Sequence, residues 1–98
     1  MRDLPESKKR CARVAALLKN LAHPQRLFLL CRLARGESTV SSLREACGSS
    51  QSLISQHLTR LRREGLVRSR RQGNFVLYRI SNPKLSALIQ TMEKIFNE

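Results

Sequence analysis

Residues 46–80, ACGSSQSLISQHLTRLRREGLVRSRRQGNFVLYRI, decide the fold, because they read as a tight turn, a helix and a β-hairpin in succession. Ser50 is predicted to be the N-cap of the helix, since a serine oxygen can accept a hydrogen bond from the first helical turn. Glu64 closes the helix, and Gly65 can adopt the left-handed conformation that commonly follows a last turn. Both ends of this helix are therefore specified by the local sequence.

The predicted helix has two different faces. Ile54, Leu58 and Leu61 recur at i, i+4 and i+7 and form one apolar stripe. The opposite side carries short polar side chains and a basic one, namely Ser52, Ser55, Gln56, Thr59 and Arg63. Side chains of this kind can reach base edges in a major groove, where glutamine suits adenine and serine donates or accepts. The alternative is an ordinary solvated helix face, since most surface helices have one.

The sequence before this helix favours the DNA-reading alternative. Residues 40–47 are predicted to form a short amphipathic helix, and Gly48-Ser49 supplies the tight turn between the two helices. Together these segments predict a helix-turn-helix over about residues 40–64.

The sequence after the helix predicts a basic wing over about residues 66–80. One strand begins at Leu66, a second contains Phe75 and Ile80, and residues 68–74 between them are predicted to be a hairpin tip with Gly-Asn as its turn signal. Residues 49–80 hold seven arginines and one glutamate, a local balance of +6. Basic residues at such a tip suit a phosphate backbone or a minor groove.

Composition limits the classes of function. The chain has 98 residues, a formal net charge of +12 and a pI near 11.3, which predicts a single domain (1–98) with a polyanionic partner, most simply nucleic acid. A membrane partner is disfavoured because no apolar stretch approaches the length of a span. Three cysteines without a spaced framework suit a reducing cytosol, so a soluble, cytoplasmic, nucleoid-associated protein is expected.

Three further helices are predicted. They cover about residues 7–22 with Ser7 as N-cap, residues 24–35 ended by Gly36, and residues 83–97 with Asn82 as N-cap. The fold class is therefore mainly α with a β-hairpin wing, a winged helix-turn-helix. The last helix has an apolar face too wide for one small core, which predicts a homodimer through the first and last helices. The alternative is that this face packs wholly within one chain.

Two segments resemble the ArsR/SmtB family of winged-helix transcription regulators. LLKNLAHPQRLFLLCRLARGE (residues 17–37) resembles the first two helices of the family, and SSQSLISQHLTRLRREGLVRSRRQGNFVLYRI (residues 49–80) resembles its recognition helix and wing. The resemblance implies homodimers that bind palindromic operators in double-stranded DNA, usually as repressors released by an inducer.

The resemblance also implies DNA-contacting positions. Matched to the DNA-reading motif are Ser50, Gln51, Ser52, Ser55, Gln56 and His57, and Arg70, Arg71 and Gln72 fall in the wing. The outward positions Thr59, Arg60 and Arg63 complete the candidate set. His57 flanks the apolar stripe, so a histidine at the edge of the core is an open alternative to a DNA contact.

Metal sensing is not expected, because both metal boxes of the family lack their ligands here. The third-helix box usually reads Glu-Leu-Cys-Val-Cys-Asp, whereas residues 37–42 read ESTVSS. The last-helix box needs carboxylate and histidine ligands, and residues 81–98 contain no histidine. No metal or other cofactor is predicted.

The cysteines leave a redox hypothesis open. The chain is most similar to the HlyU/BigR/SqrR-like subgroup, which responds to sulfide, persulfide or oxidants, and Leu30-Cys31 matches its second-helix motif. The second cysteine of that subgroup is missing, with Asn97 near its place. Cys11 is a candidate substitute if the first two helices form a hairpin, and an inert core role for Cys31 is the alternative.

These observations predict a sequence-specific DNA-binding regulator, most simply a repressor acting as a homodimer, with release by oxidation or persulfidation at Cys31 as a hypothesis. The alternatives are a non-specific architectural protein that uses charge alone, and a regulator that acts by displacing another repressor. An enzyme is not predicted, because no nucleophile with a base, paired carboxylates or phosphate-binding glycine loop is present.

Overall fold

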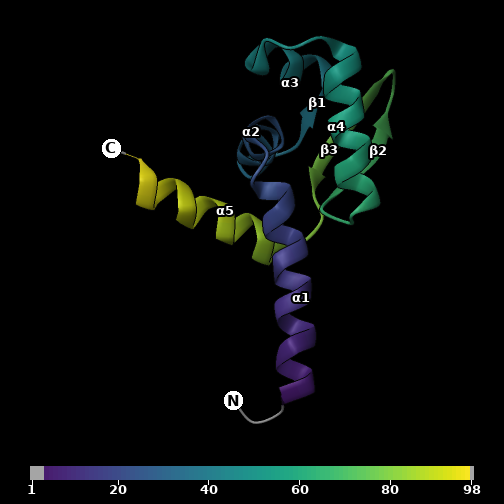
Figure 1. The fold of residues 1–98 in the computed structure, drawn as a ribbon. Helices are drawn as coiled ribbons and strands as arrows, with labels where there is room; N and C mark the ends of the chain where they lie inside the picture. The colour runs from purple at the N-terminus through teal and green to yellow at the C-terminus, as the bar shows by residue number, and fades with distance from the viewer. Residues whose placement is uncertain (1–3, 98) are drawn as a thin grey trace.

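The computed structural model describes residues 4–97, so residues 1–3 and 98 of the predicted domain lie outside the described part. Five helices and three strands follow one another: α1 Leu4–Leu21, α2 Pro24–Leu33, β1 Ser38–Thr39, α3 Val40–Cys47, α4 Gln51–Arg63, β2 Val67–Gln72, β3 Phe75–Ile80 and α5 Pro83–Phe96. The predicted class, mainly α with a β-hairpin wing, is confirmed. Figure 1 shows α1 extending away from the body formed by α2–α4 and the sheet.

The helix-turn-helix has the ends that its sequence predicts. Ser50 Oγ accepts a hydrogen bond from the backbone N–H of Leu53 at 3.2 Å and so caps α4. Thr39 does the same for α3, accepting from the backbone N–H of Ser42 at 3.1 Å. Gly48 and Gly65 both have left-handed backbones, with φ of 75° and 76°, and end the two helices.

Two predicted helix ends are wrong. α1 begins at Leu4, so Ser7 lies inside the helix and is buried instead of capping it; Glu6 in the first turn favours the earlier start, since an acid there complements the helix dipole. α2 ends at Leu33 with Ala34 as its C-cap, not at Gly36. Two i→i+3 hydrogen bonds, made by the N–H groups of residues 35 and 36, tighten the chain before the predicted end.

The sheet differs most from the prediction. Its strand order is β1-β3-β2, with all neighbours antiparallel, and β1 was not predicted. β2 runs through to Gln72, so the hairpin turn holds only Gly73 and Asn74, with φ of 61° at Gly73. The basic residues 68–71 therefore belong to an edge strand and not to a loop. Charged side chains are well tolerated on an edge strand, where they discourage pairing with other chains.

The core lies where α2 meets α3, α4, the sheet and the start of α5. Its fully buried large side chains are Leu29, Leu30, Leu43, Ile54, Leu58, Leu61, Val67 and Ile89. The apolar stripe of α4 is part of this cluster, so burial fixes which side of α4 faces outward. α5 begins against this body, with Asn82 Oδ1 accepting from the backbone N–H of Lys84 at 2.8 Å.

Candidate nucleic-acid interface

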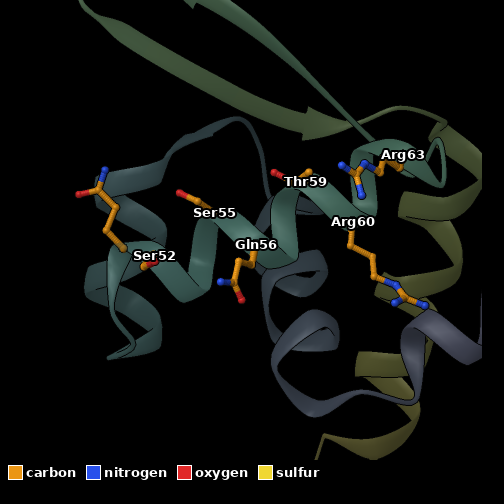
Figure 2. Close-up of a pocket in the computed structure, with 7 residues that line it drawn as sticks. Ser52, Ser55, Gln56, Thr59, Arg60 and Arg63 are labelled. Carbon is orange, nitrogen blue, oxygen red and sulfur yellow. The ribbon is translucent and has the colours of Figure 1, made fainter.

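The outer side of α4 is an open hollow. Its lining comes entirely from this helix and consists of Gln51, Ser52, Ser55, Gln56, Thr59, Arg60 and Arg63. Six of these side chains are labelled in Figure 2, where they form two rows with i, i+4 spacing, Ser52–Gln56–Arg60 and Ser55–Thr59–Arg63. The structure thus brings seven of the predicted DNA-contacting residues onto one surface.

The chemistry of this surface suits a nucleic acid. Hydroxyl and amide groups occupy its first two turns, guanidinium groups occupy its end, and none of the seven lining residues is acidic. Serine and glutamine side chains can bond base edges in a major groove, and arginines can bond phosphates or guanine. Uncharged hydrogen-bonding side chains therefore lie at one end of the surface, and positively charged side chains lie at the other end.

The turn before α4 is fixed by a residue that the sequence did not single out. Gln25 Nε2 at the start of α2 donates to Ser49 Oγ at 2.7 Å, and Cys47 Sγ donates to the same oxygen at 3.5 Å. These bonds tie the turn of the helix-turn-helix to α2. No local pattern could have indicated the bond from Gln25, because its partner lies 24 residues later in the chain.

His57 lies apart from the outer surface, on the side of α4 that faces α2. Its ring centroid is 4.8 Å from that of His23, with an angle of 58° between the planes. His23 Nδ1 accepts from the backbone N–H of Arg26 at 3.5 Å and caps α2. Partial burial lowers the pKa of His57, and His23 and Arg26 lower it further. Of the two readings that the sequence left open, this position favours a histidine at the edge of the core.

The three predicted wing residues have different surroundings. Arg71 and Gln72 are exposed near the turn. Arg70 is instead paired with Glu37, donating from Nε to Oε2 at 2.7 Å and from Nη2 to Oε1 at 2.8 Å. This pairing lowers the pKa of the Glu37 carboxyl, first through the hydrogen bonds and then through the charges of Arg70 and Arg79. No local pattern in the sequence indicates this partner, which lies 33 residues away.

Known proteins match this chain over nearly its whole length. A family model described as bacterial regulatory protein, arsR family, matches residues 23–69. A biofilm growth-associated repressor of Agrobacterium fabrum is 43% identical over 93 residues, which are 95% of this chain and 80% of that protein. The chain belongs to the ArsR family.

Solved structures of other ArsR-type regulators have the same fold. Reduced HlyU from Vibrio cholerae superimposes with a TM-score of 0.90 at 37% identity, over 97% of this chain and 100% of that one. A winged helix-turn-helix DNA-binding domain from Mycobacterium bovis, described as homodimeric and as a possible ArsR-family regulator, gives a TM-score of 0.81 at 30% identity, over 96% and 87% of the two chains. The predicted resemblance to the HlyU/BigR-like members is confirmed, and the chain is a transcriptional regulator of the ArsR family and not an enzyme.

The cysteines of this ArsR-family chain are free thiols in different surroundings. Cys31 is half-buried on α2, and burial followed by the Glu93 carboxylate raises its pKa, against a smaller opposite effect of Arg35. Cys11 is exposed on α1, which extends away from α2 in Figure 1 and does not form the hairpin that the Cys11–Cys31 pairing requires. The premise for that substitute pair within one chain is therefore wrong.

Within residues 4–97, no group of three or more histidine, cysteine, aspartate or glutamate side chains could hold a metal ion. No helix in this range is long and apolar enough to cross a membrane.

Proposed function

We propose that the protein is a sequence-specific DNA-binding regulator that acts as a homodimer on a palindromic operator, most simply as a repressor. The outer surface of α4 carries the proposal, because its uncharged hydrogen-bonding side chains and arginines face solvent on a rigid, capped helix. An α4 in the major groove would present Ser52, Ser55 and Gln56 to base edges. A net charge of +12 supplies attraction to phosphates that does not depend on sequence.

A second copy of the chain is the proposed partner of α1 and α5. Val14 and Leu18 on α1 are 47% and 49% exposed, and Ile95 and Phe96 on α5 are 66% and 79% exposed. Large apolar side chains left in water on two projecting helices favour association, because burying them removes apolar area from water. The Mycobacterium bovis relative is described as homodimeric, which supports association of two copies.

A dimer with two-fold symmetry requires a particular spacing and symmetry of the DNA site. The two copies of α4 would enter successive major grooves about 34 Å apart, one turn of B-DNA, so the operator would be an inverted repeat. The candidate contacts are the seven residues of the α4 surface, with Arg71 and Gln72 of the wing on the adjacent backbone. Ser50 contributes by capping α4.

A narrower part of the proposal concerns release from DNA. Oxidation would begin with attack of the Cys31 thiolate on one oxygen of a peroxide, which breaks the O–O bond and gives a sulfenic acid and hydroxide. Attack of the same thiolate on a sulfur atom of a polysulfide would break the adjoining S–S bond, give a persulfide and release the shortened polysulfide as the leaving group. The modified side chain would disturb the packing of α2 against α5, since Cys31 contacts the core and Glu93 of α5 acts on its charge. The raised pKa of Cys31 leaves little thiolate at neutral pH, so we expect slow reaction that accelerates at alkaline pH.

The test is a binding titration on the DNA upstream of the protein's own gene and on a scrambled duplex of equal composition, each at several salt concentrations. We expect Gln56→Ala to weaken binding to the native duplex more than to the scrambled one and Arg63→Gln to weaken binding to both duplexes alike, with Arg13→Gln on α1 as the control for loss of one charge. Equal affinity for both duplexes, falling steeply with salt, would instead identify an architectural protein that uses charge alone.

The release hypothesis is tested by repeating the titration after peroxide or polysulfide and then reductant. Reversible loss of affinity in the wild type and in Cys47→Ser, but not in Cys31→Ser, is expected. Equal loss in the Cys31→Ser variant removes Cys31 from the mechanism and leaves the DNA-binding proposal intact.

A further inference from the structure

The Glu37–Arg70 pair is a bidentate contact across the sheet. Glu37 precedes β1 at one edge, Arg70 lies on β2 at the other edge, and β3 runs between them. Both carboxylate oxygens of Glu37 accept from Arg70, at 2.7 and 2.8 Å. Two parallel hydrogen bonds fix the plane of the guanidinium as well as its distance, which a single contact does not. The pair therefore ties the outer edge strand of the wing to the segment between α2 and β1.

Strand alternation puts Arg70 and Arg71 on opposite faces of the sheet. Val67 is buried in the core, and Ser69 Oγ accepts from Arg62 Nη1 of α4 at 3.4 Å, so the odd-numbered residues of β2 face α4. Arg71 continues this face. Arg70 belongs to the other set and extends over the face that is turned away from α4, where Glu37 holds it.

That far face carries a concentration of positive charge. Arg68 and Arg79 are direct cross-strand partners there, and like charges in such positions repel. Arg70 is the next residue along β2 on this face. The Glu37 carboxylate lies among them, and the charges of Arg70 and Arg79 both lower its pKa, so it is ionised at neutral pH. Glu37 thus offsets repulsion on the far face of the wing.

We propose that Glu37 is a positioning residue that withholds Arg70 from DNA, so that Arg71 and not Arg70 is the arginine with which the wing contacts phosphate. The proposal rests on the proposed DNA-binding function. It follows from the pairing, because an arginine whose Nε and Nη2 are already bonded to a carboxylate is poorly placed to bond a phosphate, and the carboxylate itself repels one. Withholding a contact that every sequence offers lowers the affinity for all DNA alike, since phosphate contacts carry no sequence information.

The experiment measures salt dependence of binding to two duplexes, one selected by the protein from a random pool and one scrambled from it. Each phosphate contact contributes about 0.9 to the slope of log affinity against log salt, or about a threefold change between 50 and 200 mM salt. We expect Arg71→Gln to make the negative slope shallower by about 0.9 and Arg70→Gln to leave the slope unchanged. A larger slope means a steeper fall of affinity with salt. Glu37→Gln should raise the slope by the same amount on both duplexes and leave the preference for the selected one unchanged.

The double variant Glu37→Gln/Arg70→Gln decides whether Glu37 acts through Arg70. If it does, the added slope disappears in the double variant. If Glu37 acts only as a general negative charge, the added slope persists without Arg70 and also appears in Glu45→Gln, a control that removes an exposed carboxylate from α3. Thermal melting of each variant without DNA establishes that it is folded before binding is compared.

Three results overturn the proposal: an equal loss of slope in Arg70→Gln and Arg71→Gln, persistence of the added slope in the double variant, or no change in Glu37→Gln. Failure of the proposed sequence-specific DNA binding is a separate result. In that case the protein would enrich no duplex from the random pool. The slopes on an arbitrary duplex of the pool would still report which arginine contacts phosphate.

Discussion

Replacing Ser50 by alanine tests whether the local capping of α4 supports the DNA-reading surface. The Ser50 hydroxyl satisfies one of the otherwise unpaired N–H groups in the first turn, that of Leu53, at 3.2 Å. Loss of an N-cap oxygen costs about 1 kcal/mol, within a range of about 0.5–2. In a domain of this size that free energy corresponds to a fall in Tm of about 4–8 °C. Thermal denaturation at matched protein concentration measures it, because association shifts the Tm of a dimer.

The control variant is Ser50→Asn, which keeps a capping oxygen and should retain most of the stability. The affinity of Ser50→Ala for DNA is a second measurement. If Ser50 acts only through the cap, the affinity of Ser50→Ala for DNA falls by about fivefold for a cap loss of about 1 kcal/mol, and by about thirtyfold at most for a loss of about 2 kcal/mol. A larger fall would mean that Ser50 contacts DNA directly. An unchanged Tm in Ser50→Ala, or an equal loss in Ser50→Asn, would refute the capping argument.

Three other predictions concern the core, the dimer and pH. Leu58→Ala should lower the free energy of unfolding by about 2–5 kcal/mol, measured by urea titration, because Leu58 is fully buried and its truncation leaves a cavity. Leu18→Asp should give a monomer in light scattering and lose preference for the native duplex, whereas wild-type mass or preference would exclude α1 from the interface. His57 has a lowered pKa in the folded state, so the unfolded state binds more protons and stability should fall as pH drops below about 6.5. His57→Gln should flatten this dependence in urea titrations between pH 7 and 5, and an unaltered pH dependence would exclude His57 as its source.

The elements that the sequence predicted are those whose signals are local. α4 has an N-cap, an i, i+4, i+7 apolar stripe and a glycine within 16 residues, and its ends match the prediction. The outward surface follows from the same stripe, because a buried side determines the exposed one. Seven of the twelve predicted DNA-contacting positions accordingly share one surface.

The features that the sequence missed depend on partners far apart in the chain. β1 has only two residues, too few for any periodicity, and exists because β3 pairs with it. The basic residues of β2 suggested a loop, since charged residues are less common in strands, but an edge strand accommodates them. Glu37 resembled the remnant of a metal box in the linear sequence, and only the sheet brings it to Arg70.

In a strongly basic protein that reads sequence, phosphate contacts raise the affinity for all DNA, and base contacts distinguish one sequence from another. Affinity from phosphates grows with each added guanidinium and is the same at every site in a genome. On α4 the two kinds of proposed contact would be separated along the helix, because the uncharged Ser52, Ser55 and Gln56 precede Arg60 and Arg63. The first turns of a recognition helix are the part that reaches base edges, so we expect base contacts at the beginning of α4 and phosphate contacts at its end. The Glu37–Arg70 pair would likewise limit phosphate contacts on the wing, since it holds one of the arginines that strand alternation turns away from α4.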